Sequence, residues 1–191
     1  MRALTFKKGI HPHGHKDATE HRAFVEHPVG DKVYIPLSQH IGAPAKAIVA
    51  VGDYVKMGTL IAEAGGYVSS NIHSSVSGKV VAFEQRENVQ GRKAMHIVIE
   101  NDNEYETDYM QPLINPTKEQ IIARCKEAGI VGMGGATFPT HVKLETKSKI
   151  TKVIINGSEC EPYITTDYRM MLDMADRVLQ GIGYIQKALG A

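Results

Sequence analysis

The residues best suited to chemistry form a glycine-rich segment over positions 132–140. Gly132, Gly134 and Gly135 lie within four residues, and Pro139 then fixes the direction of the chain. Because glycine lacks a Cβ, its backbone N–H groups can closely approach an anion, and it readily adopts positive φ angles. Lys143, shortly afterwards, can add a point charge for a phosphate. The segment is therefore predicted to bind a phosphate group.

A second polar segment follows the apolar run over residues 152–155, which we predict to be a β-strand. It carries Asn156, Glu159 and Glu161 at the carboxyl end of that strand. In open α/β sheets, ligands bind at the carboxyl ends of strands. Amide and carboxylate groups suit the polar edge of a heterocycle better than a sugar or a metal ion. The two segments together predict a nucleotide-cofactor site, and we expect a flavin.

A purely structural interpretation of the glycine segment has to be weighed, because turns use glycine commonly. The segment follows a helical pattern and precedes a strand, which is the wrong order for the dinucleotide fingerprint, and the P-loop pattern is absent. Taken alone, the segment favours a structural turn. The second polar segment reverses this balance in favour of a cofactor site.

The polar amino-terminal region contains a cluster of five histidines. They are His11, His13, His15, His21 and His27. A metal site is conceivable, but zinc generally needs a rigid frame of four ligands, and no paired cysteines are present. We therefore expect structural or solvent-exposed roles for this cluster. For His40 and His73 we expect hydrogen bonds within turns, whereas His141 lies beside the glycine segment and within reach of a phosphate.

The two cysteines, Cys125 and Cys160, are far apart and form no CxxC motif. This argues against a disulfide framework and indicates a reducing compartment. Cys160 lies between Glu159 and Glu161, whose negative charges would raise its pKa, so we do not expect a nucleophilic thiolate. Iron–sulfur ligation would require several cysteines at close spacing.

The chain of 191 residues has a hydrophobic content of 42% and a net charge of +1, which suggests neither disorder nor a nucleic-acid partner. No apolar run approaches the length of a membrane span. Three regions are predicted: an irregular arm over residues 1–32, a strand-rich domain with its linker over 33–115, and an α/β region over 116–191. The expected strands of the second region are 33–37, 47–51, 59–63, 78–83 and 95–100.

The period of the apolar residues becomes helical after Thr117, which forms a predicted capping box with Gln120. Gly129 is expected at the C′ position of this helix. A second helix is predicted to begin near Asp167 and to carry a buried apolar stripe, with its methionines in the core. The stripe consists of Met171, Met174, Val178, Ile182, Ile185 and Leu189.

The strand-rich region is similar to the half-barrel sandwich of biotinyl and lipoyl carrier domains, with turns at residues 51–58 and 77–80. Carriers present a modified lysine at a hairpin tip. Here Gly65 and Gly66 occupy that place, and no lysine lies between Met57 and Gly78. We therefore expect a carrier fold without its carrier residue, used for scaffolding or docking.

Residues 134–139, followed by Asn156, Glu159 and Glu161, resemble the flavin- and NADH-binding subunit of respiratory complex I. They resemble the RnfC subunit of the Rnf electron-transport complex more closely. The segments 9–12, 35–44 and 72–78 agree, so the resemblance covers nearly the whole chain. It implies a mixed α/β protein: a barrel-sandwich β domain, then the first half of a Rossmann-like domain that binds FMN and NADH.

The resemblance also implies roles for individual residues, with no catalytic side chain and no metal ligand, since hydride chemistry belongs to the flavin. The implied FMN contacts are Gly132, Gly134, Gly135, Ala136, Lys143, Asn156 and Glu159. Phe138 and Glu161 would contact NADH. The chain departs from complex I at Met133 and Thr137, where complex I has arginine and glycine, and at Ser158, where it has aspartate.

For the intact protein, the resemblance implies a subunit of an ion-translocating ferredoxin:NAD oxidoreductase, with a pair of 4Fe–4S clusters in a later segment. Its expected partners are NADH, other Rnf subunits and, indirectly, ferredoxin. Its expected location is peripheral, on the cytoplasmic side of the bacterial inner membrane. The present chain is expected to be the soluble amino-terminal part, without bound FMN and prone to pair with another copy.

Two other classes of function stay open at this point. Related flavoproteins with the same modules reduce cobalamin or supply electrons to amino-acid reductases in the cytoplasm. Alternatively, the chain is a non-catalytic assembly module. The coupling ion and the direction of electron flow are not encoded in these residues.

Overall fold

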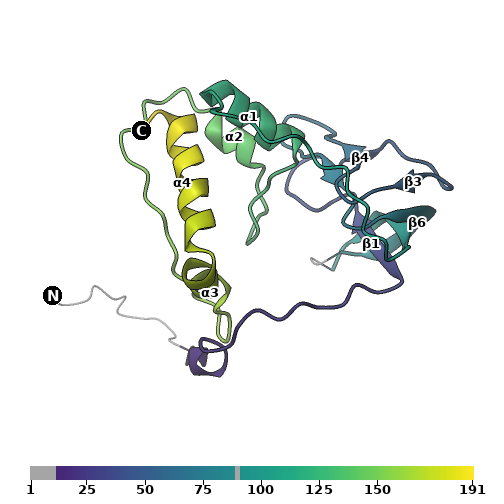
Figure 1. Ribbon diagram of the computed structural model, residues 1–191, viewed down its shortest axis with the longest axis horizontal. Coiled ribbons are helices and arrows are strands. Elements are labelled where there is room, and N and C mark those ends of the chain that lie inside the picture. Colours follow the sequence, from purple (N-terminus) through teal and green to yellow (C-terminus); the bar gives the residue numbers. More distant parts are fainter. Residues whose placement is uncertain (1–11, 89–90) are drawn as a thin grey trace. The chain divides into compact units, whose positions relative to one another are not determined.

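The computed structural model of the chain describes residues 12–88 and 91–191 (Figure 1). These residues form two compact units, and each is described by itself. One unit contains the described residues up to Glu26 together with Lys152–Gly183, and the other contains His27–Thr151 together with Tyr184–Ala191.

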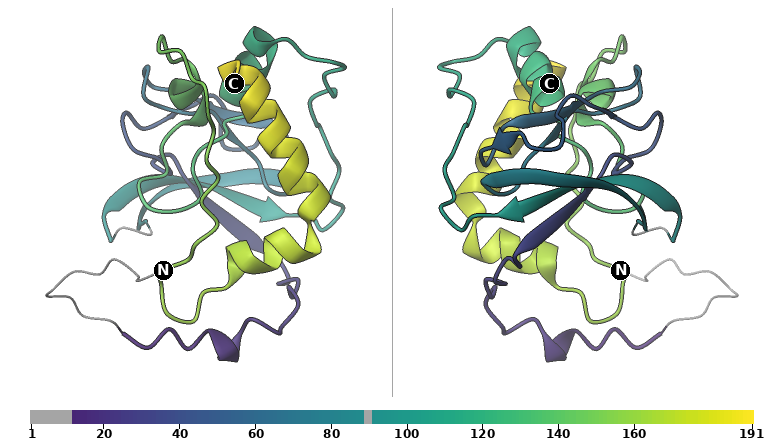
Figure 2. Two further views of the ribbon diagram at one scale, coloured as in Figure 1. Left: turned by 90° about the vertical axis from the view of Figure 1, so that its left-hand side faces the viewer. Right: turned by 90° about the vertical axis from the view of Figure 1, so that its right-hand side faces the viewer.

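The larger unit contains two antiparallel sheets. In spatial order, the strands of the first sheet are β1 (Lys32–Pro36), β7 (Lys93–Asn101), β6 (Gly78–Glu87) and β3 (Tyr54–Val55). The strands of the second sheet are β2 (Lys46–Ala47), β4 (Leu60–Glu63) and β5 (Ile72–His73). The long β6–β7 pair dominates the first sheet in the side views (Figure 2). The predicted barrel-sandwich architecture is confirmed.

The core of this unit consists of aliphatic side chains from the strands and the turns between them. Its buried members are Ile35, Ala45, Val55, Ile61, Ala62, Ile72, Val76, Val80, Ile97 and Ile99. Val80 and Ile99 face each other in the register of β6 and β7, and both are fully buried. Full burial of such a side chain stabilises the fold by about 1.5–3 kcal/mol, so this cluster is what holds the sheets together.

The turn that contains Gly65 and Gly66, where carrier domains have their modified lysine, is closely packed. A Cβ on Gly65 would lie 2.1 Å from the carbonyl oxygen of Pro44. The N–H of Gly65 donates to Ser69 Oγ at 2.9 Å, and that hydroxyl donates to the carbonyl of Ala43 at 2.8 Å. The turn is therefore tied to a neighbouring loop, and no lysine projects from it.

Helix α1 (Lys118–Glu127) has the predicted capping box: Gln120 N–H donates to Thr117 Oγ1, and Thr117 N–H donates to the Gln120 side chain. Gly129 follows the helix with φ +69°, as predicted for a C′ glycine. Helix α2 (Thr140–Leu144) packs beside α1, and Ile121, Leu144 and Ala188 form their shared core.

The predicted second helix consists of α3 (Thr166–Asp173) and α4 (Ala175–Leu189), divided at Met174. Its predicted start is confirmed, but the prediction that its methionines are buried is wrong. Met171 is 40% exposed and Met174 is 38% exposed. The rest of the stripe is half-buried, and Ala188 in the last turn is fully buried. A helix face is buried only where another layer covers it, and in the described chain the covering core lies at the end of α4.

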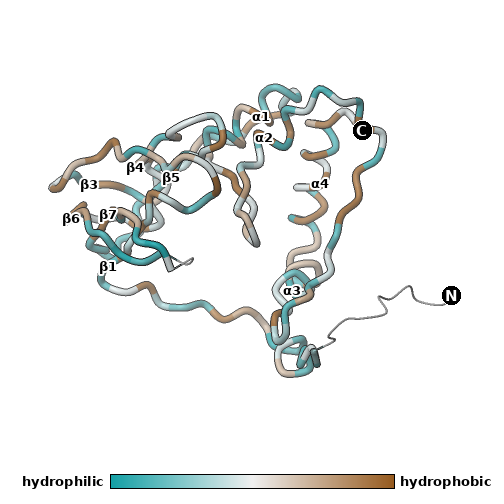
Figure 3. Tube along the Cα trace, turned by 180° about the vertical axis from the view of Figure 1, so that it is seen from behind, coloured by the Kyte–Doolittle hydropathy of each residue, from teal (hydrophilic) through white to brown (hydrophobic). Residues whose placement is uncertain are grey.

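The predicted strand over residues 152–155 is also wrong, because this segment has no regular structure. The segment is the apolar stretch that leads towards α3 and is brown in Figure 3. Its Ile154 side chain is 81% exposed. A strand exists only when a neighbour accepts its backbone hydrogen bonds, and none of the described strands pairs with these residues. No helix within residues 12–88 and 91–191 has the length and apolar character needed to cross a membrane.

Candidate cofactor-binding site

The glycine-rich segment folds into a narrow loop closed at its base. Gly132 N–H donates to the carbonyl of Phe138 at 3.0 Å, and Thr140 N–H donates to that of Ile130 at 2.9 Å. Within the loop, Thr137 N–H donates to the carbonyl of Gly134 at 3.2 Å. Met133 is 98% exposed, so the tip of the loop lies in solvent.

The backbone of this loop offers unused hydrogen-bond donors. In the part of the chain that the structure describes, the N–H groups of residues 133–136 donate to no acceptor. A Cβ on Gly134 or Gly135 would meet nothing within 4 Å, and Gly135 has φ +54°. Consecutive free N–H groups in such a turn form a concave anion-binding site. These donors are chemically suited to a phosphate group, and phosphate binding by the loop stays a prediction.

Thr137 has φ +48°, in the left-handed region that costs a residue with a Cβ about 1–2 kcal/mol. Its hydroxyl donates to the carbonyl of Ala136 at 2.7 Å. The threonine therefore keeps the glycine-like backbone angle at an energetic cost.

Beyond the loop, α2 places Lys143 near Phe138. The Lys143 Nζ lies 5.7 Å from the centroid of the Phe138 ring, and the lysine side chain is exposed. His141, on the same helix, is only 2% exposed, and its Nδ1 is buried without a partner in the described residues. Burial lowers the pKa of His141, so the neutral ring is favoured. Its buried position argues against contact with a phosphate at the loop surface.

The second polar segment is organised by its own hydrogen bonds. Asn156 Oδ1 accepts the N–H of Ser158 at 3.0 Å. The Glu159 carboxylate accepts the N–H groups of Asp167 at 3.0 Å and Tyr168 at 3.3 Å, and so caps α3. Glu161 is exposed. The side chains of Asn156 and Glu159 are therefore held by contacts within the segment and to α3, and these contacts do not depend on a strand.

Burial raises the pKa of Glu159, but hydrogen bonds from backbone N–H groups and the charge of Lys16 outweigh this effect. The net pKa lies below the ordinary value for glutamate. Glu159 is therefore an ionised carboxylate in the positive field of a helix amino terminus.

The candidate residues thus form two groups. Gly132, Gly134, Gly135, Ala136, Phe138 and Lys143 lie in the larger unit, and Asn156, Glu159 and Glu161 lie in the smaller one. The structure brings together the members of each group. That the two groups complete one cofactor site stays a prediction.

Contacts from the amino-terminal arm to the second polar segment were not predicted from the sequence. Lys16, in the 3₁₀ turn η1 (Lys16–Ala18), donates from Nζ to the carbonyls of Glu161 and Ile164. Thr19 Oγ1 donates to the carbonyl of Tyr163 at 2.6 Å. These partners are more than 140 residues apart in sequence, so no local pattern could have indicated them.

The described histidines of the arm contact neighbouring residues, and His15 also stacks on Tyr163. The His13 and His15 ring centroids lie 4.3 Å apart, and the His21 Nε2 lies 3.3 Å from the Glu20 carboxylate. His11 lies outside the described residues. Among the residues that are described, no three His, Cys, Asp or Glu side chains are grouped in a way that could hold a metal ion.

Two other histidine predictions had different outcomes. His40 forms the expected turn contacts: its Nε2 accepts the N–H of Ser70 at 3.1 Å, and its Nδ1 lies 3.1 Å from the carbonyl of Ile41. For His73 the prediction is wrong at Nε2, which is buried without a hydrogen-bond partner in the described chain.

Both cysteines are free thiols. Cys160 is exposed and Cys125 is half-buried, and burial raises the pKa of Cys125.

Comparison with known families gives two successive matches, separated by residues 105–124. Residues 4–104 match the RnfC barrel sandwich hybrid domain, and residues 125–191 match the Nuo51 FMN-binding domain. The match to the second family contains the glycine loop and the second polar segment.

Three curated relatives align along nearly the whole chain. The C subunit of a proton-translocating ferredoxin:NAD(+) oxidoreductase complex from Clostridium ljungdahlii is 44% identical, with 97% of this chain and 42% of that protein covered. Its Na(+)-translocating counterpart from Acetobacterium woodii is also 44% identical, with 97% and 43% covered. The C subunit of an ion-translocating oxidoreductase complex from Rhodobacter capsulatus is 41% identical, with 100% and 38% covered. The chain thus spans about two fifths of the length of these relatives.

Proposed function

Because the chain belongs to the RnfC family, we propose that its full-length protein transfers electrons between NAD(H) and iron–sulfur clusters through FMN. It would do so as a subunit of a membrane-associated, ion-translocating ferredoxin:NAD oxidoreductase. The relatives are named as the C subunits of such complexes, which supports partnership with other Rnf subunits. We place the 4Fe–4S clusters in the part of the protein beyond these 191 residues, and the protein itself at the cytoplasmic side of the membrane.

The observation that carries this proposal is the row of free N–H groups over residues 133–136, within a segment that matches an FMN-binding domain. Free N–H donors suit the phosphate of FMN, and the exposed Lys143 beside them adds a positive charge. The donor set therefore fits the phosphate end of the flavin.

We extend the proposal to individual residues as the family resemblance implies. Gly132, Gly134, Gly135 and Ala136 approach the flavin phosphate and ring by their backbone, and Lys143 pairs with the phosphate. Asn156 and Glu159 meet the polar edge of the isoalloxazine, and Phe138 and Glu161 contact the nicotinamide nucleotide. When bound, FMN supplies the hydride-accepting chemistry, and these residues bind and orient the reactants.

The substitution Gly134→Ala in the full-length protein tests the flavin part of the proposal. The added methyl group meets no atom of the chain within 4 Å, and Gly134 has no positive φ, so the fold should be unaffected. If FMN approaches this backbone, its affinity should fall about tenfold or more, which corresponds to about 1.4 kcal/mol. Titration of the apoprotein with FMN measures the effect.

Gly181→Ala is the matched control, because a Cβ there also meets open space but lies in the interior of α4. It should leave FMN affinity unchanged. Equal affinities for the wild-type protein and Gly134→Ala would contradict the assignment of the loop.

Glu161→Gln in the full-length protein tests the NADH part. Loss of a charged hydrogen-bond partner should lower kcat/KM for NADH roughly tenfold or more, while flavin content stays nearly unaltered. Steady-state NADH oxidation and flavin absorbance are the measurements. Unchanged kinetics, or loss of the flavin itself, would show that Glu161 has another role.

A further inference from the structure

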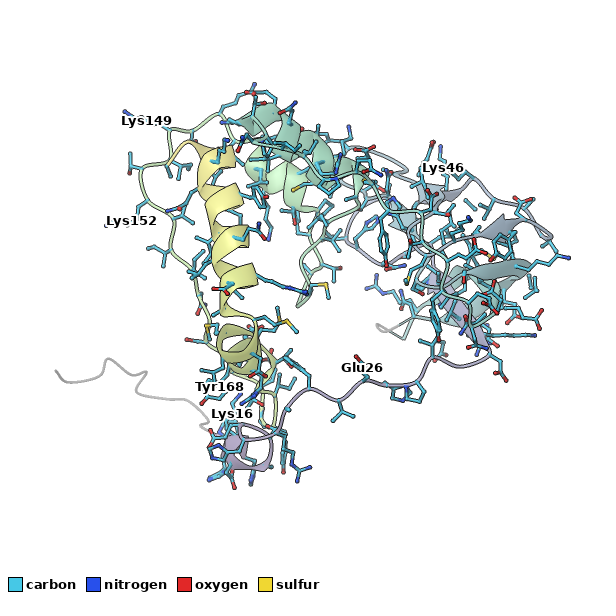
Figure 4. The ribbon with its side chains drawn as sticks, viewed as in Figure 1. Lys16, Glu26, Lys46, Lys149, Lys152 and Tyr168 are labelled. Carbon is cyan, nitrogen blue, oxygen red and sulfur yellow. The ribbon has the colours of Figure 1, made fainter. Side chains whose placement is uncertain are left out.

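The amino-terminal arm holds the backbone of the second polar segment at several points. The Lys16 ammonium donates to the carbonyl of Glu161 at 2.8 Å and also to that of Ile164. Figure 4 labels Lys16 at the arm and Tyr168 on α3, the helix that follows the segment. An ammonium group has three donors, so it can bridge two carbonyls on either side of a turn.

Tyr163, between these two carbonyls, is held on three sides. Its carbonyl accepts from Thr19 Oγ1 at 2.6 Å, and its N–H donates to the carbonyl of Gly14 at 2.8 Å. Its ring stacks on His15 with centroids 4.8 Å apart and an interplanar angle of 7°. Tyr163 has φ +66°. A residue with a Cβ keeps such an angle only where its surroundings over-determine it, as these contacts do.

The charge of Lys16 also acts on the carboxylate of Glu159. The hydrogen bonds of Lys16 go to carbonyl oxygens, so its positive charge is not cancelled by a bonded carboxylate. The effect of that charge on the pKa of Glu159 has the sign expected for a nearby cation. The side chain that fixes the backbone of Glu161 therefore also favours the ionised carboxylate of Glu159.

We propose that Lys16 is a positioning residue, which fixes the backbone from Glu161 to Ile164 so that the Glu161 carboxylate is presented to the nicotinamide nucleotide. This inference rests on the proposed function and deepens it. Lys16 touches neither reactant in this scheme: it acts through the two carbonyls that it bridges.

The test is Lys16→Met in the full-length protein, which keeps most of the apolar stem and removes the charge and all three donors. The expected result is a rise in KM for NADH of roughly tenfold, with kcat and flavin content within about twofold of wild type. Lys16→Arg restores charge and donors with a different geometry, so it should recover part of the loss.

Lys149→Met is the matched control, since Lys149 is an exposed lysine that makes no hydrogen bond or ion pair within the described chain. It should behave as wild type. Thr19→Val removes the hydroxyl that holds the carbonyl of Tyr163 but keeps Lys16 intact. For Thr19→Val we expect a smaller rise in KM for NADH than for Lys16→Met. If Lys16→Met cannot be produced as a folded protein, Thr19→Val tests the proposal in its place.

The outcomes separate this inference from the function on which it rests. If Glu161→Gln impairs NADH oxidation but Lys16→Met and Thr19→Val leave KM unchanged, the positioning role is overturned and the proposed function stands. If Glu161→Gln has no effect, the proposed role of Glu161 fails, whatever the arm variants do. Failure of Lys16→Arg to recover any activity lost in Lys16→Met would also count against positioning by this cation.

Discussion

Glu159 is the residue whose structural and predicted roles differ most. Its position after an apolar run indicated a ligand contact, but its carboxylate accepts two N–H groups at the start of α3. An acid at a helix amino terminus both satisfies free N–H groups and interacts favourably with the helix dipole. Glu159 therefore ties the second polar segment to α3, and a flavin would meet a carboxylate that is already oriented.

The pH dependence of this cap follows from the pKa of Glu159, which is lower in the folded protein than the ordinary value for glutamate. Its stabilising contribution is therefore complete above that ordinary value and is lost as pH falls through the lower, folded-state pKa. We expect the hydrogen-exchange protection of the Asp167 and Tyr168 amides to decrease in this acid range.

In Glu159→Gln, protection of these two amides should be reduced at neutral pH and should lose its acid-dependent step. Hydrogen exchange followed by NMR is the measurement. An unchanged acid step in the variant would assign the titration to another group.

At the scale of elements, the parts predicted correctly are those whose signals are local. Helix α1 has its own capping box and its own C′ glycine, so its sequence contains its boundaries. The segment 152–155 has the apolar character of a strand, but a strand also needs a neighbour, which no local pattern supplies. Strands β3 and β5 have two residues each, too few to show a period.

In the candidate site, too, the parts predicted correctly are those with local sequence signals. The glycine loop, with its positive φ at Gly135, could be predicted because glycine in a turn is a local signal. The contacts of Lys16 and Thr19 could not, because their partners are distant in sequence and are backbone carbonyls, which any residue provides. The Glu159 cap was missed because its helix begins several residues later, beyond the usual capping position.

The end of α1 gives a prediction at this scale. Gly129 and Gly91 both have φ +69°. A Cβ added at Gly129 would lie 2.2 Å from the carbonyl oxygen of Asn71, whereas a Cβ added at Gly91 would meet nothing within 4 Å. Both alanine variants should lose about 1–2 kcal/mol of stability to the left-handed backbone. Gly129→Ala should lose roughly 1–3 kcal/mol more, because backbone must move to relieve the contact.

Urea unfolding of the two variants measures the difference, and Gly91→Ala supplies the correction for backbone conformation. Equal losses of stability would mean that the chain near Asn71 yields freely, so that α1 is not packed closely against this turn.

At the scale of the whole molecule, apolar surface remains open on the last two helices. Leu172 is 55% exposed and Leu179 is 65% exposed, together with the exposed methionines of α3. Several large apolar side chains exposed on neighbouring helices are typical of an interaction face. A doubly wound domain builds its cofactor crevice from several strands, and among the described residues no strand lies beyond position 116.

The 191-residue chain should therefore purify without colour, whereas the longer protein should be yellow. Losing the contacts of the remaining crevice wall, even about 4 kcal/mol, would weaken FMN binding by about a thousandfold. The flavin absorbance of the two purified proteins is the comparison to make. A stoichiometric flavin spectrum from the shorter chain would contradict this expectation.

The open apolar face should also make the 191-residue chain associate with itself. Light scattering should show a mass that rises with concentration. Leu179→Glu, which places a charge on this face, should shift the equilibrium towards monomer, and Lys149→Met should not. If the wild-type chain is monomeric at all concentrations, the exposed apolar face does not cause self-association.

The bond from Lys16 to the carbonyl of Glu161 joins positions 145 residues apart, which has a consequence for the timing of synthesis. At a ribosomal rate of about 5–20 residues per second, the arm waits roughly 7–30 s for its partner. Strands β1 to β7 emerge within that interval, and β domains of this size commonly fold in milliseconds to seconds. The waiting arm is polar and exposes little surface that could aggregate. Among the described segments, the arm is thus synthesised first but is one of the last to form its tertiary contacts.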